Sequence, residues 1–547
     1  MEYKKNDVYS LTITDANMDG DGVGKLDGFP IFVKDTVIGD VAEVKLIKVK
    51  KNYGYGRLMK LIQPSKNRVE PRCDVARQCG GCQLQFYSYQ EQLRFKENKV
   101  KNHLERIGKV TGYQFHPIIG MEEPFHYRNK AQFPIGRNKD GRVIVGFYAG
   151  RTHSIIEYKD CVLGSKENKP ILEIILKFME EYQITPYQET THTGLVRHIL
   201  IRQGYHTGEI MVCMVINGTM LPHAKELVKR LQVLEHITSI MVNCNQEKTN
   251  VILGKELITL WGNDFITDFI GDICFRISPL SFFQVNPIQT EQLYQKALQY
   301  ANLSGKEMVW DLYCGIGTIS LFLAQKAKKV YGVEIVEQAI ENAKENAKRN
   351  QIENVEFFTG KAEEVFPAWY RQNREQADVV VLDPPRKGCE EVLLQTIAEM
   401  KVERIVYISC DSATLARDVG ILDGMGYRLL EVTPVDMFAQ TVHVESIVLL
   451  SKLKSNKLKH INVELEMDEL DLTAAESKAT YEEIKDYILK QSGLKVSNLY
   501  IAQVKQKCGI IERANYNLPK SENSRQPKCP PEKEMAIRKA LEHFGMI

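Results

Sequence analysis

Features that would place the chain in several special classes are missing from its sequence of 547 residues. It has no run of about 18 apolar residues, so we expect no membrane-spanning helix and no membrane partner. The charged N-terminus lacks the apolar core of a signal peptide. The 72 basic and 70 acidic residues leave a net charge of only +2, which argues against a polybasic coat for nucleic acid. The 12 cysteines are therefore expected to be reduced thiols, metal ligands or catalytic groups in a cytoplasmic protein of three or four domains.

Residues 1–62 alternate short β-like runs with glycine-containing turns, which predicts a small five-stranded barrel of the oligonucleotide-binding kind. The segment Lys45–Arg72 holds nine basic residues against one acid, Glu70. Tyr53 and Tyr55 lie among these basic residues. Basic residues interleaved with aromatic rings suit an RNA-binding surface, and the alternative is an ordinary solvated basic edge.

Three further regions follow the barrel. Residues 63–285 are rich in strands, with a helix predicted over 87–108 that places Leu93 and Ile107 on its apolar face and packs on the catalytic domain. Residues 286–454 alternate apolar strands with helices, which predicts an α/β, Rossmann-like, mostly parallel sheet with helices on both faces. Residues 455–547 begin with an acidic run, are expected to form a small helical domain, and suggest either a nucleic-acid arm or a docking module.

A short glycine loop follows one predicted strand, in the segment Asp311–Thr318. Gly315 and Gly317 let a ligand approach the backbone closely, and Glu334 at the next strand end suits a ribose diol. The loop lacks the G-x-G-x-x-G spacing of dinucleotide enzymes. It is similar to loops of S-adenosylmethionine-dependent methyltransferases, so we expect this cofactor to bind here, with Gly315 and Thr318 among its contacts.

A cysteine identifies the target atom. Asp383 is followed by two prolines, a pattern that also occurs in enzymes that methylate amines. Cys410 lies between a predicted strand and helix, at the same sheet edge, where a helix N-terminus favours the thiolate. Carbon 5 of uracil becomes nucleophilic only after a thiolate adds at carbon 6, and a base must then remove the carbon-5 proton. We predict Cys410 as this nucleophile and Glu445 as the base, and the alternative for Cys410 is a small buried core residue.

These segments resemble the RNA (uracil-5-)-methyltransferase family over roughly residues 1–453, together with the segment Phe282–Asn286. The resemblance implies a covalent mechanism through Cys410, with Glu445 as proton acceptor. It also implies that the cofactor and the target base are lined by four residues: Gln284, Tyr313, Glu334 and Asp383. The chain departs from many relatives at Asp411–Ser412, where Asn-Pro is common, and at Lys361, near the expected adenine contact.

A second group of cysteines comprises Cys73, Cys79, Cys82 and Cys161. Four thiolates could bind zinc or an iron–sulfur cluster. The spacing does not match the C-x3-C-x2-C signature of radical enzymes. It resembles the [4Fe-4S] site in the family branch that modifies 23S ribosomal RNA, so an iron–sulfur cluster is expected in residues 63–285, with a structural or RNA-organising role rather than a catalytic one. The same branch carries an N-terminal TRAM barrel, whereas related transfer-RNA enzymes generally lack both features.

The sequence thus predicts a methyltransferase that uses S-adenosylmethionine to modify carbon 5 of a uridine in 23S ribosomal RNA. The target uridine would have to leave its stack to reach the pocket. Two alternatives remain open: the same reaction on transfer RNA, and an RNA-binding or assembly factor without catalysis. The segment His126–Gln132 also looks like a family segment and is a candidate RNA contact.

Overall fold

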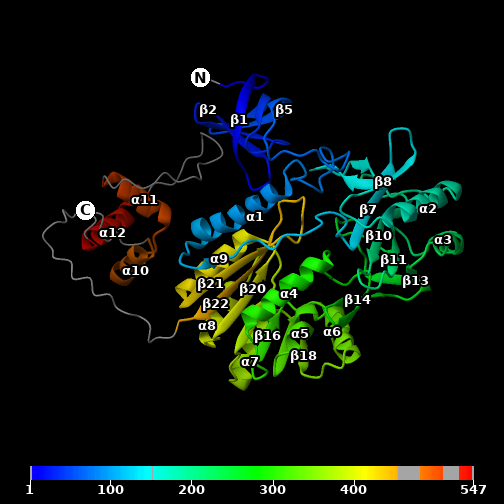
Figure 1. The fold of residues 1–547 in the computed structure, drawn as a ribbon. Helices are drawn as coiled ribbons and strands as arrows, with labels where there is room; N and C mark the ends of the chain where they lie inside the picture. The colour runs from blue at the N-terminus through cyan, green and yellow to red at the C-terminus, as the bar shows by residue number, and fades with distance from the viewer. Residues whose placement is uncertain (1–2, 151, 454–480, 509–528, 545–547) are drawn as a thin grey trace. The chain divides into compact units, whose positions relative to one another are not determined.

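The computed structural model describes residues 3–150, 152–453, 481–508 and 529–544. The chain divides into two compact units, Met1–Lys457 and Leu458–Ile547. Figure 1 traces the first unit from the N-terminal barrel to the sheet that ends near residue 453. Within the described ranges, no helix is both long and apolar enough to cross a membrane.

The N-terminal strands form the closed barrel that the sequence predicts, in the order β1-β2-β3-β5-β4. The strands are β1 (Val8–Ala16), β2 (Gly22–Leu26), β3 (Phe29–Val33), β4 (Val41–Val49) and β5 (Gly54–Gln63). Their inward side chains, such as Leu11, Ile31 and Val44, are fully buried. Gly56 is required for closure, because a Cβ atom there would lie 2.2 Å from Cγ1 of Val44.

A seven-stranded sheet with the order β13-β12-β11-β10-β7-β8-β9 forms the centre of the first unit. Its strands are β7 (Lys130–Arg137), β8 (Val143–Tyr148), β9 (Ile155–Glu157), β10 (Val196–Gln203), β11 (Ile210–Ile216), β12 (Ile237–Cys244) and β13 (Glu256–Gly262). Two helices, α2 (Asn168–Glu181) and α3 (Ala224–Leu231), pack on one face of this sheet. A separate hairpin consists of β14 (Ile266–Ile270) and β15 (Ile273–Ile277).

A long helix, α1 (Tyr89–His103), continues into one π-helical turn, η1 (Leu104–Gly108). The predicted apolar face is partly wrong, because Ile107 is 46% exposed while Gln92 and Lys96 are buried. The two polar side chains are buried because they bind groups far away in the sequence, described below. At the far end, η1 packs closely on a later helix, since a Cβ atom on Gly108 would lie 2.7 Å from the Ala416 carbonyl oxygen.

The last sheet of the first unit has eight strands in the order β18-β17-β16-β19-β20-β22-β21-β6. Its strands are β6 (Gln114–Phe115), β16 (Met308–Leu312), β17 (Lys329–Glu334), β18 (Val355–Thr359), β19 (Val379–Leu382), β20 (Arg404–Ser409), β21 (Tyr427–Val435) and β22 (Glu445–Lys452). Its helices are α4 (Pro287–Ala301), α5 (Thr318–Ala324), α6 (Glu337–Arg349), α7 (Ala362–Asn373), α8 (Glu391–Glu399) and α9 (Ser412–Gly424).

The strands from β18 to β20 are parallel, and β22 runs antiparallel to both β20 and β21. One core cluster joins the sheet to α4 and α5, and a second joins its other face to α1, α8 and α9. The expected doubly wound architecture with helices on both faces is therefore confirmed (Figure 1). Strands β21 and β6 were not predicted.

The second unit contains the helices α10 (Tyr481–Ser492), α11 (Asn498–Lys507) and α12 (Pro531–His543). Their apolar side chains form a small core of their own, made of Ile484, Ile488, Ile501, Val504, Ile537, Ala540 and Leu541. The predicted acidic run lies outside the described residues.

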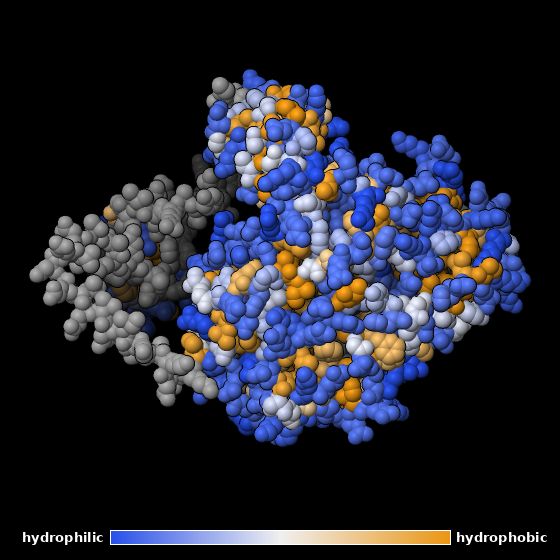
Figure 2. All heavy atoms as spheres, viewed as in Figure 1, coloured by the Kyte–Doolittle hydropathy of each residue, from blue (hydrophilic) through white to orange (hydrophobic). Residues whose placement is uncertain are grey.

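The surface of the first unit in the view of Figure 2 is mostly hydrophilic, with hydrophobic residues in small groups between charged ones. Such small groups are normal on a water-facing surface.

Candidate active site

The glycine loop lies at the carboxyl end of β16 and is fixed by the end of β17. Tyr313, Gly315 and Gly317 all have positive φ angles, of 75°, 56° and 81°. The Gly315 amide donates to Oε2 of Glu334 at 3.2 Å, and Oε1 of Glu334 accepts from the amide of Val336 at 2.9 Å. No atom lies within 4 Å of a Cβ position on Gly315, so the loop borders open space beside the Glu334 carboxylate.

Two carboxyl groups, the buried Asp311 and the half-buried Asp383, lie at the ends of the neighbouring strands β16 and β19. Asp311 accepts a hydrogen bond from Ser320, and its second oxygen has no partner among the described residues. Burial raises the pKa of both groups to about 7, and the charge of Asp311 adds to the rise in the pKa of Asp383. Nearby, the hydroxyl groups of Tyr294 and Thr318 are 2.8 Å apart.

The strand register brings Cys410 and Glu445 together. Ser409 pairs with Ser446 in the antiparallel ladder between β20 and β22. Cys410 follows Ser409 and Glu445 precedes Ser446, so the two residues lie next to each other at the end of the ladder. Cys410 is half-buried just before α9, whereas Glu445 is 4% exposed. The charges of Glu445 and Asp383 both act on Cys410, and Arg386 opposes them. Two residues predicted from separate motifs thus meet at one sheet edge.

The expected stabilisation of the Cys410 thiolate by the helix N-terminus is outweighed. Burial, followed by the charges of Glu445 and Asp383, raises the pKa of Cys410 to about 11. Burial and then Asp383 raise the pKa of Glu445 to about 8, while Arg386 acts in the opposite direction. Desolvation and nearby acids disfavour an additional negative charge more than the helix end favours it.

The segment after Asp383 is attached to the helix that follows Cys410. The Arg386 carbonyl accepts from the Thr414 hydroxyl at 3.1 Å, and the Lys387 carbonyl accepts from Arg417 at 2.9 Å. Asp411 caps α9 by accepting from the amides of Ala413 and Thr414. The sequence Asp411–Ser412, which stands where many relatives have Asn-Pro, is therefore compatible with a normal helix start.

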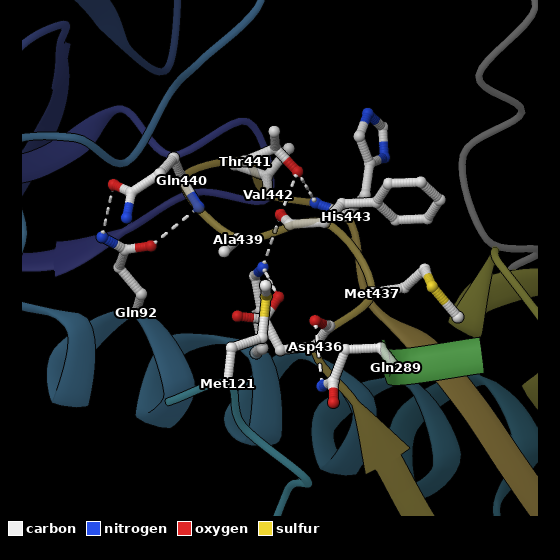
Figure 3. Close-up of polar contacts among 12 residues, drawn as sticks. Gln92, Met121, Gln289, Asp436, Met437, Ala439, Gln440, Thr441, Val442 and His443 are labelled. Atoms are coloured by element: carbon white, nitrogen blue, oxygen red, sulfur yellow. Dashed lines mark hydrogen bonds and ion pairs between the residues drawn. The ribbon is translucent and has the colours of Figure 1, made fainter. Parts of the chain in front are cut away.

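The segment before Glu445 is held by α1, as Figure 3 shows. Gln92 donates to the side-chain oxygen of Gln440 and accepts from the Gln440 amide, both at 3.0 Å. Lys96 forms a fully buried ion pair with Asp436, which also accepts from the Tyr89 hydroxyl at 2.8 Å. These residues were missed at the sequence level, because each pair is separated by more than 300 positions.

The other predicted pocket residues lie at the rim of this arrangement. Gln284 is 8% exposed, and its carbonyl accepts from Asn129 at 3.0 Å. The Tyr313 hydroxyl donates to Glu363 at 2.6 Å, which ties Tyr313 to α7 rather than to Cys410. Lys361 pairs with Glu364 at 2.9 Å. Glu363 was not predicted, although it lies only two residues after Lys361.

The four cysteines of the predicted metal centre line one cavity of about 330 Å³, together with Arg128 and Lys130. Burial raises the pKa of Cys82 to about 12 and, with Arg202, lowers the pKa of Lys130 to about 7. Among the described residues, no group of three or more ligand-type side chains is arranged to hold a metal ion. Arg128 and Lys130, which belong to the candidate RNA-contact segment His126–Gln132, line this cavity, and the RNA contact of that segment stays a prediction.

Comparisons with known proteins agree with this fold. A family model described as tRNA (Uracil-5-)-methyltransferase matches residues 88–453, and a TRAM domain model matches residues 3–59. An uncharacterized RNA methyltransferase of Clostridium tetani is 52% identical over 449 residues, which cover 82% of this chain and 97% of the relative. One of Halalkalibacterium halodurans is 51% identical over 447 residues, with 82% and 97% covered.

A solved structure is also similar, that of the Pyrococcus abyssi tRNA (uracil-54, C5)-methyltransferase in complex with S-adenosyl-L-homocysteine. It has a TM-score of 0.66 and 30% identity, and the match covers 81% of this chain and 100% of that one. The fold and the matches define an RNA methyltransferase with a TRAM domain. The chain belongs to the tRNA (uracil-5-)-methyltransferase family.

Proposed function

We propose that this protein methylates carbon 5 of a uridine in 23S ribosomal RNA, with S-adenosylmethionine as the methyl donor. The observation that carries the proposal is the meeting of Cys410 and Glu445 at the sheet edge that also holds the glycine loop. A half-buried thiol beside a buried carboxyl group provides the nucleophile and the base that addition and elimination at a pyrimidine ring require.

Cys410 and Glu445 have separate roles in this reaction. The Cys410 thiolate adds to carbon 6 of the uracil, and the electrons of the 5,6 double bond move toward carbon 5 and the O4 carbonyl. After carbon 5 has gained its methyl group, the Glu445 carboxylate removes the remaining carbon-5 proton. The sulfur–carbon bond then breaks, which restores the double bond and the free thiolate. Arg386 stabilises the thiolate, because it opposes the rise in the pKa of Cys410.

The cofactor pocket is assigned to the glycine loop and its neighbours. Gly315 and Glu334 border open space, where the carboxylate would accept from a ribose diol. Further contacts are assigned to Gln284, Tyr313, Thr318 and Asp383. S-adenosylmethionine, when bound, supplies an electrophilic methyl group. Asp383 at the adjoining strand end is close enough to affect Glu445 and so borders both the cofactor and the target base.

The four-cysteine cavity is assigned to a [4Fe-4S] cluster. Cys73, Cys79, Cys82 and Cys161 are proposed as its ligands because they line one cavity and four thiolates are the ligand set of such a cluster. Arg128 and Lys130 line the same cavity and would balance the negative charge of four thiolates. The role of the cluster would be to hold the loop 73–82 against the segment around Cys161.

Ribosomal RNA is favoured over transfer RNA by the combination of the TRAM barrel and the four cysteines. Transfer RNA is the second candidate, because the similar Pyrococcus abyssi protein is named as a transfer-RNA enzyme. Either substrate is consistent with the expected cytoplasmic location.

One comparison tests the reaction and separates the two substrates. Purified protein is incubated with labelled S-adenosylmethionine and either unmodified 23S ribosomal RNA or unmodified transfer RNA, and the nucleosides are then analysed. We expect 5-methyluridine in the ribosomal RNA only. Label in transfer RNA alone would contradict the substrate, and absence of 5-methyluridine from both would contradict the function.

A further inference from the structure

A cavity of about 1120 Å³ lies in the central sheet, outside the candidate active site. It is lined by the hairpin of β7 and β8, by the segment 185–194 and by the start of β10. We propose that this cavity binds one unstacked nucleotide of the substrate RNA, in addition to the uridine that is methylated. This inference rests on the proposed RNA substrate and adds a second contact to it. The volume exceeds the roughly 300–1,000 Å³ typical of small-ligand pockets, so a nucleotide and part of its backbone would fit.

His198 on β10 is the polar group at the wall of the cavity that most needs a ligand. It is 4% exposed, and among the described residues neither of its ring nitrogens has a hydrogen-bond partner. Burial, followed by the charge of Arg197, lowers the pKa of His198 to about 4, so the ring is neutral at pH 7. A neutral imidazole offers one donor and one acceptor, the pair that the edge of a nucleobase can satisfy. A buried polar group without a partner is costly, which argues for a ligand here.

Aromatic rings beside His198 supply surfaces for stacking. Tyr148 meets the His198 ring edge-on at 6.4 Å between centroids, and its hydroxyl donates to Glu189 at 3.3 Å. Tyr187 also lines the cavity, but it is only 8% exposed and the guanidinium of Arg197 lies 4.6 Å from its ring centroid, so Tyr148 is the main surface for stacking. Protein aromatic rings bind unstacked bases in this way without strong sequence preference.

The charge of the lining favours a phosphate. The two acids, Glu157 and Glu189, already have basic partners in Arg142 and His153. Arg137 at the end of β7 and Lys139 in the turn that follows line the cavity. Arg137 donates to the Gly141 carbonyl at 2.5 Å, and neither residue forms an ion pair within the described ranges. Arg197 is fixed by the carbonyls of the loop 245–249. The cavity therefore combines base-edge, stacking and phosphate-binding groups.

The face of the central sheet on which the cavity lies also suits a contact with the substrate. Ile199 and Ile201 pack with α2 in one core cluster, so His198 and Leu200 point to the other face. Leu200 belongs to the core cluster that contains Val309 and Ile447 of the catalytic sheet. A nucleotide bound near His198 would thus lie on the side of the central sheet that adjoins the catalytic sheet.

Replacement of His198 distinguishes a ligand contact from a packing role. In the full-length protein, His198→Leu should weaken binding of unmodified 23S ribosomal RNA by about fivefold while thermal stability stays equal or rises, because an unpartnered polar group is removed. Ser239→Ala is the matched control, since Ser239 is also buried and unpartnered in this sheet but does not line the cavity. It should leave RNA affinity unchanged. Unchanged affinity in His198→Leu would overturn the proposal.

Replacement of Tyr148 tests stacking. Tyr148→Leu should lower RNA affinity about tenfold, as expected for loss of one stacked base, whereas Tyr148→Phe should bind like the wild type. Equal binding by both variants would contradict stacking on this ring. If either variant unfolds, photo-crosslinking decides: 23S ribosomal RNA containing 4-thiouridine, bound to wild-type protein, should give crosslinked peptides that include Tyr148 or Tyr187. Crosslinks confined to other peptides would overturn the proposal.

Failure of this inference is distinguishable from failure of the proposed function. Binding and crosslinking need no methyl transfer, whereas the function is read from 5-methyluridine. If the protein methylates RNA but His198→Leu binds RNA as well as the wild type does, only the proposed nucleotide site in the cavity is refuted. If the protein forms no 5-methyluridine but crosslinks to RNA through Tyr148, only the proposed methylation reaction is refuted.

Discussion

At the scale of single residues, the site combines a thiol and a carboxyl group whose pKa values both lie above their usual ranges. Cys410, Glu445 and Asp383 are partly desolvated together, and Arg386 is the main opposing charge. Perturbed groups of this kind cluster at functional sites. The motifs made Cys410, Glu445 and Asp383 visible in the sequence, whereas Arg386 was not predicted. The effect of these residues on one another's pKa values could not be predicted, because it depends on burial and on the register between β20 and β22.

Loss of the proposed base should stop the reaction after methyl transfer. In Glu445→Gln, the carbon-5 proton stays on the ring and the bond to Cys410 cannot break, so methylated RNA should remain attached to the protein. Denaturing electrophoresis with labelled methyl groups measures this. Glu399→Gln, an exposed change at the end of α8, is the control and should turn over normally. Normal release of RNA by Glu445→Gln would assign the base to another residue.

The release step should depend on pH through Glu445. Its pKa is raised to about 8, so the carboxylate that accepts the proton becomes more abundant as pH rises through 8. In a single-turnover experiment, the rate at which the adduct decays should rise about tenfold between pH 7 and pH 9 and then level off. A rate that is flat over this range would contradict the raised pKa of the base.

At the scale of elements, α1 acts as a support for the segment that carries Glu445. Its sequence pattern predicted the helix, but placed Ile107 on the apolar face and gave no reason to bury Lys96. That burial depends on Asp436, which lies 340 positions away. Strand β6 was missed for a similar reason: its two residues pair only with β21 and have no pattern of their own.

Removal of the buried lysine should destabilise this support. Lys96→Met leaves Asp436 buried without its counter-ion and should lower the free energy of unfolding by about 3–5 kcal/mol. Asn98→Ala, an exposed change in the same helix, should alter it by less than about 0.5 kcal/mol. Denaturant unfolding measures both. Equal stability of the two variants would show that the ion pair does not hold the segment.

At the scale of the whole molecule, the barrel, the α/β sheet and the family followed from the sequence because strand alternation, glycine turns and short motifs are local signals. The size and lining of the cavities did not follow, because they arise from segments far apart in the chain. The second unit has its own core and lies beyond the family match, which ends at residue 453.

Methyl transfer should not require the second unit. The family match ends at residue 453, and the two relatives match over 97% of their own length while the match covers 82% of this chain. A protein truncated after Lys457, at the division between the two units, should methylate the same RNA with a kcat within about twofold of the full-length value. A folded but inactive truncation would mean that the second unit contributes to the active site.

The most direct measurement is covalent trapping on RNA that contains 5-fluorouridine. Fluorine at carbon 5 cannot leave as a proton, so the wild-type protein should accumulate an adduct that survives denaturation, in the presence of S-adenosylmethionine. Cys274→Ala, which removes another partly exposed thiol, should form the same adduct. Cys410→Ala should form none, and an adduct of full yield in that variant would contradict the account.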